Sequence, residues 1–511
     1  MKMEFRDGPP IGQRRSPHQP ALTRRARATR SRFLLGGLSA LAVACGAAGQ
    51  APTAPAEGQG IAEVNPAPPR LGGKAPVRLT YWKSLVGPRH DAQVALVESF
   101  NASRPDVHVT LEHAGEYSAA ADKLRIALAS GAAPDVAMLA VNTDLPAFAR
   151  GGALQPLDPF FRGGAGDSGN GGGAPGAARG APARRPAEHG GGSADGAGGF
   201  YPGFIRDSRI DGRLYQLPFA RSTPLLYVNV DLLRAAGLPE TPPSSWPELL
   251  ETSRPLLRIR GGGSTAVEGA IGVLEESRIP AAYGVGTSWW EFQSLLWSFG
   301  GAFSDQQLRV RIDDAPSVEA MQFLADLVHR HRVALATKTA QQQFLRGQIA
   351  FLTVSSASLT QIEGEALFRV VAAPLPGHRR RAIPGGGSGL SLLKDSGPQR
   401  HAAGWDFLSF MTSAENTAAF ARATGYTPVR PAALRDAALQ EFIVARPNAR
   451  TALSQLADVQ PTDAILAAPS ANRHIEAALS RILFDGAAVP QTCADLAQSL
   501  RTQAALLKAA P

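Results

Sequence analysis

Few residues of this chain stand in a pattern that could support catalysis. Ser388 lies in the segment GGGSGLS, but a G-x-S-x-G nucleophile turn needs glycine at position 390, which is Leu390. The sequence holds neither G-x-x-x-x-G-K-[ST], which cradles phosphates, nor H-E-x-x-H, which binds zinc. His329 and His331 lie two apart on an expected helix, so they face different sides and make a poor metal pair. We therefore expect no catalytic residues, no metal and no cofactor.

Binding chemistry is indicated instead by a short polar break in the apolar stretch Leu217–Asp231. Pro218 and Pro224 punctuate this stretch, and residues 225–228 (LLYV) can form a buried strand. Between the two prolines lie the polar residues 221–223, where the backbone is held extended. The pattern predicts a strand that leaves one lobe, exposes short polar side chains at a crevice and enters a second lobe.

Strands and helices are expected to alternate along the chain, and these elements must position the polar residues 221–223. Strands are expected at 77–82, 107–111 and 134–139, and helices at 91–101 and 117–130. Such alternation predicts an α/β fold with a parallel, doubly wound sheet, whose ligands bind outside the carboxyl ends of the strands. Later elements are helices at 246–257 and 317–331, an aromatic segment at 289–299, a strand at 368–373 and a glycine-rich loop at 384–391.

The charge of the chain does not indicate a nucleic-acid partner. Its formal net charge is +9, but residues 1–32 hold nine basic and two acidic residues, a net of +7, which leaves +2 for the rest. A basic patch on the folded part, which nucleic acid requires, is therefore not expected.

Residues 1–44 are predicted to be a signal peptide. The basic stretch is followed by the twelve uncharged residues of Phe33–Ala44, too few for a membrane-spanning helix, which needs about twenty. The segment Ala42-Val43-Ala44-Cys45-Gly46 resembles a bacterial lipobox, although Ala42 stands where leucine is usual. We expect lipidation of Cys45, with 45–75 as a tether and the folded part outside the cytoplasm. The alternative is ordinary cleavage at an Ala-x-Ala site.

Residues 163–199 interrupt the folded part. Fifteen of these 37 residues are glycine, and none is Leu, Ile, Val, Phe, Tyr or Trp. Such a segment buries too little apolar surface to offset the cost of ordering it. It is predicted to be a disordered insertion in one lobe.

Seven segments, taken in order, resemble the extracellular solute-binding proteins of ABC uptake systems. The class is maltose-binding-protein-like, and the segments are most similar to its sn-glycerol-3-phosphate-binding members. They begin at residues 81, 100, 115, 217, 344, 383 and 405, and include YWKSLVG, FNASRPDV and IPGGGSGLSLL. The resemblance implies a two-lobed periplasmic-binding-protein fold with the ligand cleft between lobes joined by crossing hinge strands. By analogy, the first lobe comprises 76–219 with 371–413, and the second comprises 224–368 with 415–500.

The same resemblance implies ligand-binding positions. Tyrosine can cover the C–H face of a polyol and also donate a hydrogen bond, serine hydroxyls contact ligand, and a glycine N–H can approach an anion closely. The residues that match such positions are Tyr117, Ser222, Ser355, Gly386 and Tyr426.

Other positions depart from the family pattern. Asn142 stands near the place of a glutamate that binds glycerol hydroxyls, and the arginine that contacts phosphate falls at Asn472 or Arg473. Arg221 stands where the family has a small polar residue and can supply a cation from the hinge instead. Trp246 is either a stacking wall of the site or a hydrophobic residue at a helix start.

These features predict the substrate-binding component of an ABC importer. We expect a monomer, anchored to the membrane through lipid, that delivers a phosphorylated polyol or a neutral sugar to membrane permease subunits. The alternatives are a secreted hydrolase of unknown type and a surface adhesion or scaffold lipoprotein. A ligand-dependent change in tryptophan fluorescence would separate a binding protein from the latter.

Overall fold

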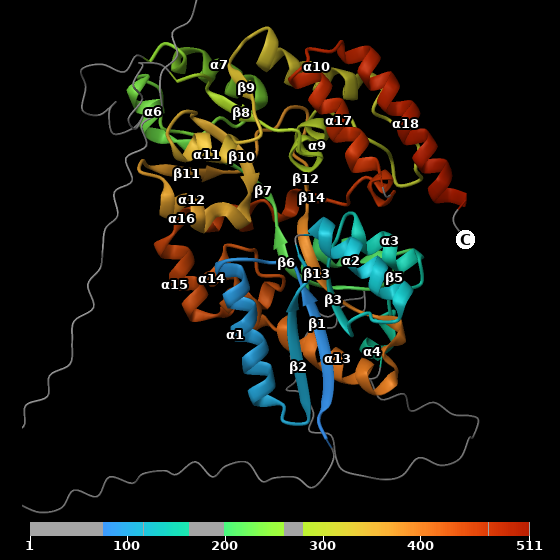
Figure 1. Cartoon of the computed structure of the whole chain (residues 1–511). Helices are drawn as coiled ribbons and strands as arrows, with labels where there is room; N and C mark the ends of the chain where they lie inside the picture. The colour runs from blue at the N-terminus through green and yellow to red at the C-terminus, as the bar shows by residue number, and fades with distance from the viewer. Residues whose placement is uncertain (1–74, 116, 163–198, 260–278, 469, 510–511) are drawn as a thin grey trace, which may run out of the picture. The chain divides into compact units, whose positions relative to one another are not determined.

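The computed structural model describes residues 75–115, 117–162, 199–259, 279–468 and 470–509, all within one unit of the chain (Figure 1). The predicted signal peptide, Cys45, the tether apart from residue 75 and the glycine-rich insertion apart from Gly199 lie outside the described residues. No helix in the described ranges is both long and apolar enough to cross a membrane.

The first lobe is built on a five-stranded sheet of order β2-β1-β3-β13-β6 (Figure 1). β1 is parallel to β2 and β3, whereas β13 is antiparallel to β3 and β6. β6 therefore runs in the same direction as β1, β2 and β3, and only β13, inserted between β3 and β6, departs from the predicted parallel sheet. The strands are β1 Val77–Lys83, β2 Val107–His113, β3 Val136–Ala140, β6 Leu217–Ser222 and β13 Gly386–Leu392.

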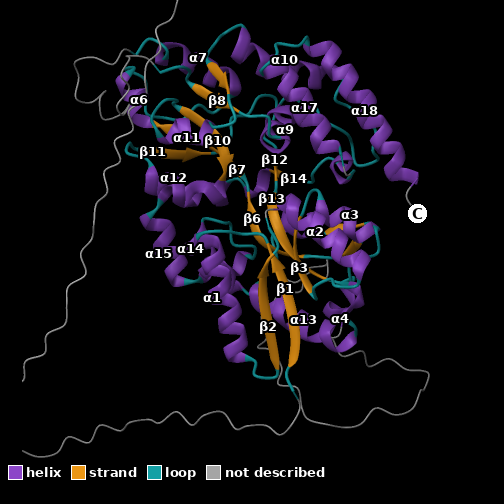
Figure 2. Ribbon diagram, in the orientation of Figure 1, coloured by secondary structure: helices purple, strands orange, loops and turns teal. Residues whose placement is uncertain are grey.

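Helices pack on both faces of this sheet (Figure 2). Alternate residues of β1 face opposite sides, so Tyr81 enters the core under α1, α13 and α14, and Trp82 enters the core under α2 and α3. Phe407 packs between Tyr81 and Phe100, with ring centroids 5.4 and 5.1 Å away. These helices are α1 Pro88–Ser103, α2 Tyr117–Ser130, α3 Asp144–Arg150, α13 Pro398–Met411 and α14 Ala414–Thr424. Smaller elements of this lobe are α4 Asp158–Arg162, α5 Pro202–Asp207, β4 Arg209–Ile210 and β5 Arg213–Leu214.

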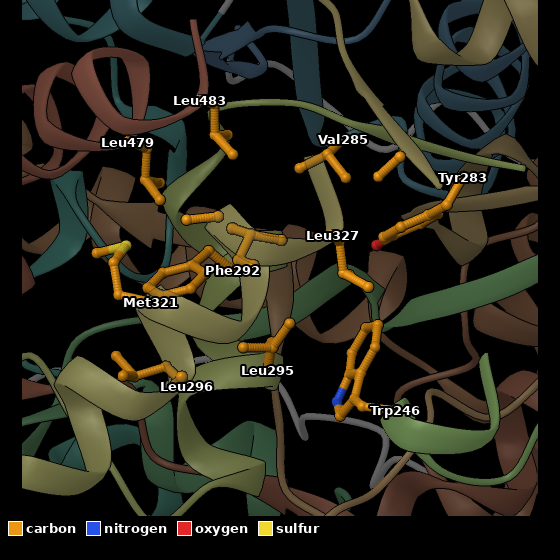
Figure 3. Packing of buried hydrophobic residues seen from close by; sticks show 14 of the residues in the cluster. Trp246, Tyr283, Val285, Phe292, Leu295, Leu296, Met321, Leu327, Leu479 and Leu483 are labelled. Atoms are coloured by element: carbon orange, nitrogen blue, oxygen red, sulfur yellow. The ribbon is translucent and has the colours of Figure 1, made fainter. Parts of the chain in front are cut away.

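The second lobe is built on a sheet of order β11-β7-β10-β8-β9. β10, β8 and β9 are parallel, and β7 runs antiparallel to β10 and β11. Its larger core, shown in Figure 3, is one hydrophobic cluster that includes Phe292, Leu296, Met321 and Leu479 as well as Tyr283 of β8. The strands are β7 Pro224–Asn229, β8 Tyr283–Val285, β9 Ala334–Ala336, β10 Phe351–Ser355 and β11 Val370–Ala373.

Helices also cover both faces of the second sheet. One group comprises α6 Val230–Ala235, α7 Trp246–Leu256, α9 Trp289–Ser298, α10 Ala315–His329, α17 Ala471–Leu483 and α18 Val489–Ala509. The other comprises α11 Ala340–Leu345, α12 Leu359–Glu365 and α16 Pro447–Ser454. α15 Ala437–Ala445 connects α14 to α16 along the chain.

The stretch Leu217–Asp231 crosses between the lobes, as predicted. β6 belongs to the first sheet, β7 belongs to the second, and Thr223 is the residue between them. The chain returns through the short strand β12 Ile383–Pro384, which pairs with β14 Val459–Gln460. The two-lobed α/β fold with crossing hinge strands is therefore confirmed.

Two of the expected lobe boundaries are wrong. β11 pairs with β7 in the second sheet, although the boundary at residue 371 assigned most of it to the first lobe. α14 packs on the first lobe, although the boundary at residue 415 assigned it to the second; its Phe420 ring lies 4.5 Å from that of Phe219. The sequences of β11 and α14 carry no signal that assigns either element to a lobe. Only the strand pairing of β11 and the packing of α14 decide this.

Candidate functional site

A cavity of about 860 Å³ is lined by residues of both lobes. Its walls include Ala140 at the end of β3, Ser222 at the end of β6 and Ser355 at the end of β10. These are carboxyl ends of strands, the edge at which α/β sheets bind ligands. The cavity brings together most of the predicted binding residues, namely Tyr117, Asn142, Ser222, Ser355, Gly386, Tyr426 and Arg473.

Two tyrosines supply hydroxyls to the cavity. The hydroxyl of Tyr117, the first residue of α2, lies 3.1 Å from that of Ser388 and also bonds Tyr426. Burial raises the pKa of Tyr117, and the nearby Tyr426 adds to this shift, so its hydroxyl stays protonated and can donate. Tyr426 stacks on Phe420 with ring centroids 5.7 Å apart, which fixes its ring.

Ser222 and Gly386 face each other across neighbouring strands. Their backbones are paired in the first sheet, and the Ser222 side chain, only 4% exposed, lines the cavity. A Cβ atom at position 386 would lie 2.5 Å from Cζ2 of Trp290, so glycine lets this ring reach the strand. The ring in turn donates from Nε1 to the carbonyl of Gly385 at 3.4 Å. A glycine is thus required here by packing, whatever the ligand.

The second lobe contributes hydroxyl and cationic groups. Ser355 ends β10, and its Oγ accepts the backbone N–H of Ala357 at 3.2 Å, which leaves its hydroxyl hydrogen able to donate. Asn472 and Arg473, the two residues considered for the position of the phosphate-contacting arginine, both line the cavity from the first turn of α17. Arg473 donates to Oγ of Ser470 at 2.9 Å.

Asn142 lines the cavity, but its amide already has protein partners. Its Nδ2 donates to the carbonyl of Gly385 at 3.0 Å, and its Oδ1 accepts from Oγ1 of Thr462 at 2.9 Å. The side chain therefore links the segment after β3 to the residues that follow β12 and β14. One amide hydrogen remains for a ligand.

The structure contradicts the predicted role of Arg221. Its side chain is completely buried, forms an ion pair with Asp207 at 2.7 Å and lies over the ring of Phe204 at 4.7 Å. Arg221 does not line the cavity. Successive residues of a strand face opposite sides, so Ser222 turns towards the cavity and Arg221 turns into the first lobe.

Trp246 is also wrong as a site residue. It is the first residue of α7, capped by Ser245, and only 2% of its surface is exposed. Its ring packs 6.3 Å from that of Tyr283 in the core of the second lobe and does not line the cavity (Figure 3). The alternative, a hydrophobic residue at a helix start, is the one observed.

Several cavity residues were missed by sequence reasoning. Trp289 and Trp290 begin α9, and Ser288 caps that helix by accepting the N–H of Glu291. A serine followed three residues later by glutamate is a helix-start signal that could have placed both rings at a helix terminus. The other missed charged residues are Arg89, Asp122, Arg125, Asp144 and Glu476.

The charges of the cavity are mixed. Arg125 is paired with Asp122, and Glu476 accepts the backbone N–H of Trp289. Burial raises the pKa of Glu476, and burial raises that of Asp144 to about 6. No group of three or more His, Cys, Asp or Glu side chains in the described ranges is placed to hold a metal ion.

Helix N-termini add partial positive charge to the cavity wall. The first turns of α2, α9 and α17 supply Tyr117, Trp289 and Asn472 to the cavity wall. Helix N-termini carry partial positive charge and unpaired N–H groups, which favour anionic or oxygen-rich ligands. The site can therefore bind a polar molecule through donors from both lobes.

Comparison with known proteins gives a consistent result. The family model of bacterial extracellular solute-binding proteins matches residues 95–448. The sn-glycerol-3-phosphate-binding periplasmic protein UgpB of Rhizobium meliloti is 26% identical over 52% of this chain and 61% of its own length. This chain thus spans less than two thirds of that relative. UgpB of Brucella melitensis is 24% identical over 76% of this chain and 83% of its own length.

Solved structures agree with these matches. The crystal structure of UgpB from Mycobacterium tuberculosis in complex with glycerophosphocholine has a TM-score of 0.69 and 30% identity, covering 84% of this chain and 98% of that one. The maltose-bound MalE3 of T. maritima has a TM-score of 0.64 at 23% identity, covering 83% and 99%, and shows the shared fold.

Proposed function

This chain belongs to the family of bacterial extracellular solute-binding proteins, and from that premise we propose that it captures a small phosphorylated polyol outside the cytoplasmic membrane. It acts as the substrate-binding component of an ABC importer and delivers the solute to membrane permease subunits. Membership of this family confirms the prediction of a binding protein rather than an enzyme. The observation that carries the proposal is the convergence of Tyr117, Ser222, Ser355, Gly386 and Tyr426 on one cavity.

A phosphate ester fits the donors of this cavity. A buried phosphate needs fixed hydrogen-bond donors and at least one positive partner. Hydroxyls of Tyr117 and Ser355, the first turn of α17 and the guanidinium of Arg473 supply both. The relatives named for sn-glycerol-3-phosphate and the structure with glycerophosphocholine support the same ligand class.

Capture works by closure of the two lobes around the solute. Ser222 belongs to the first lobe and Ser355 to the second, so one ligand can contact both. A ligand that bonds both lobes favours the closed arrangement over the open one. The crossing between β6 and β7 at Thr223 is the place where the backbone bends.

A neutral sugar is the second candidate. Trp289 and Trp290 both line the cavity, and indole faces cover the apolar C–H faces of sugar rings. The indole rings can pack against the C–H groups of a sugar or of a polyol phosphate. The two candidate ligands therefore differ, for this site, in their charge.

Calorimetry with sn-glycerol-3-phosphate, glycerophosphocholine and maltose tests the proposal. We expect saturable binding of one of the two phosphate esters and no detectable binding after Ser222→Trp, which fills the cavity. Ser454→Trp, at an exposed position on α16, is the matched control and keeps the wild-type affinity. Binding of maltose alone favours the second candidate. Binding of none of the three, or unchanged binding by Ser222→Trp, contradicts the proposal.

Anchoring and oligomeric state belong to the same proposal. We propose that a lipid on Cys45 holds the protein at the membrane, because the sequence around that residue resembles a lipobox, and that the protein acts as a monomer. Cys45→Ala is expected to move the protein from the membrane fraction to the soluble fraction of cells. Light scattering of the purified protein checks its mass against 53.6 kDa less the leader.

A further inference from the structure

Arg89 lies at the cavity although neither the family resemblance nor the sequence patterns assign it a role. It is the second residue of α1 in the first lobe, and it lines the cavity. Its Nη2 donates to the carbonyl of Ala357, 2.9 Å away, in the turn that follows β10 of the second lobe. Ala357 itself packs in the core of the first lobe, so the guanidinium contacts the segment that joins β10 of the second lobe to that core.

Most of the donor capacity of Arg89 remains available. A guanidinium has five N–H donors, and one hydrogen bond to the protein is present in the described part of the chain. Its carbon lies 5.7 Å from the ring centre of Tyr426, a cation–π contact that uses none of these donors. No carboxylate in the described ranges forms an ion pair with it, in contrast to Arg125, which is paired with Asp122.

The position of Arg89 is electrostatically unfavourable for the helix that carries it. α1 is 16 residues long, and its first turn is the positive end of the helix dipole. A cation there is unfavourable, because it lies next to the unpaired N–H groups of the first turn. Asp91 lies in the same turn but forms no ion pair with Arg89, so the positive end of α1 and the guanidinium together still attract a negatively charged group.

Hydroxyl groups lie beside Arg89 on the same wall. Ser355 lies two residues before Ala357, whose carbonyl Arg89 contacts, and Ser358 follows it directly; both serines line the cavity. Ser358 precedes α12 without capping it by a side-chain hydrogen bond. Arg473 belongs to a different wall, at the start of α17.

We propose that Arg89, together with Ser355 and Ser358, forms an anion-binding position at the junction of the lobes and sets the preference of the site for charged over neutral solutes. The group it takes is a phosphate or carboxylate of the solute, bound by the planar guanidinium in addition to the contacts from Arg473. Since Arg89 belongs to the first lobe and Ser355 ends β10 of the second, an anion bound by both adds a charged link between the lobes. This inference rests on the proposed function, because it concerns the same cavity.

The test compares Arg89→Gln, Arg89→Lys and wild type by calorimetry with sn-glycerol-3-phosphate, inorganic phosphate and maltose. Loss of charge-assisted hydrogen bonds is expected to weaken binding of sn-glycerol-3-phosphate by about 10- to 100-fold in Arg89→Gln. Arg89→Lys keeps the charge but lacks the fork and recovers part of the affinity. Arg78→Gln, an exposed arginine of β1, removes the same charge away from the cavity and is expected to bind as wild type does.

The outcomes separate this inference from the proposed function. If wild type binds sn-glycerol-3-phosphate, Ser222→Trp abolishes binding and Arg89→Gln stays within twofold of wild type, the anion position is wrong and the proposed function stands. If Arg78→Gln weakens binding as much as Arg89→Gln, the effect is one of net charge, and the inference is overturned. If wild type binds maltose but neither anion, both the anion position and the phosphorylated-solute proposal fail.

Discussion

Two arginines lie near the junction of the lobes, and their surroundings are opposite. Arg221 is fully buried, with Asp207 2.7 Å away and Phe204 beneath it, whereas Arg89 is half-buried and lines the cavity. Both stand in short polar stretches of the sequence, and only Arg221 was singled out from it as a binding residue. The difference teaches that a cation next to a hinge serves the fold when a carboxylate is buried with it, and is available to ligand when none is.

The largest expected effect concerns stability. Arg221→Met leaves the carboxylate of Asp207 buried and unpaired, which should lower the free energy of unfolding by about 3–5 kcal/mol. Arg89→Met should change it by no more than about 0.5 kcal/mol, because that residue is half-buried and unpaired with any described carboxylate. Urea unfolding followed by circular dichroism measures both.

A double variant sharpens this comparison. Arg221→Met combined with Asp207→Leu removes both partners and should recover most of the lost stability. If Arg221→Met unfolds at the same urea concentration as wild type, the buried pair does not stabilise the fold, and the contrast between the two arginines fails.

An intermediate loss of stability is expected from a substitution in β13, where Gly387 pairs with Arg221 and also lines the cavity. Gly387 has φ of +90°, and a Cβ there would lie 1.9 Å from the carbonyl oxygen of Ala220. Gly387→Ala should therefore destabilise the protein by about 3 kcal/mol. Gly364→Ala in α12 meets no atom within 4 Å and should stabilise by up to about 1 kcal/mol, since alanine favours helix. Equal melting temperatures of the two variants would contradict this backbone argument.

The smallest expected change in stability concerns two buried carboxylates, Asp207 and Asp144. Burial raises the pKa of both Asp207 and Asp144; Arg221 opposes the shift at Asp207, whereas Asp144, in the cavity wall, has no ion-pair partner in the described ranges and its pKa rises from 3.8 to about 6. Protonation of Asp144 therefore favours the folded state; this stability is fully present below pH 3.8 and is lost as the pH rises through 6. Asp144→Asn should stabilise the protein by on the order of 1 kcal/mol at about pH 8.

Urea titrations of wild type and Asp144→Asn at about pH 4 and about pH 8 check this prediction, since linkage makes the difference depend on pH. The two proteins should unfold at nearly the same urea concentration at the lower pH. A difference that is larger at the lower pH would reverse the sign and show that the charged form of Asp144 is the one stabilised by the fold.

Local elements of the fold could be predicted well because their signals are local. The helix expected at 117–130 is α2, and the strand expected at 107–111 is the first part of β2. Membership of β11 and α14 in a lobe could not be predicted, because it depends on pairing with β7 and on packing against Phe219. Those contacts join residues far apart in the chain, which periodicity does not report.

Some residues of the candidate site could likewise be predicted from the sequence, and others could not. Ser222, Ser355 and Tyr426 could be found because they stand in segments that resemble a known family. Trp246 could not be separated from a core tryptophan, since a tryptophan at a helix start has the same sequence signal in either role. Arg89 was missed because nothing in its segment marks it; its neighbours Ala357 and Tyr426 come from distant parts of the chain.

The sequence by itself determined the alternation of strands and helices, the polar break in Leu217–Asp231 and the chemical types of the binding residues. These follow from side-chain chemistry and from interactions over a few positions. Only the tertiary structure decided which face each side chain takes: Ser222 faces the cavity, and its neighbour Arg221 is buried against Asp207. The physical reason is that a one-residue step along a strand reverses the side chain, and the burial that results depends on which elements pack on each face.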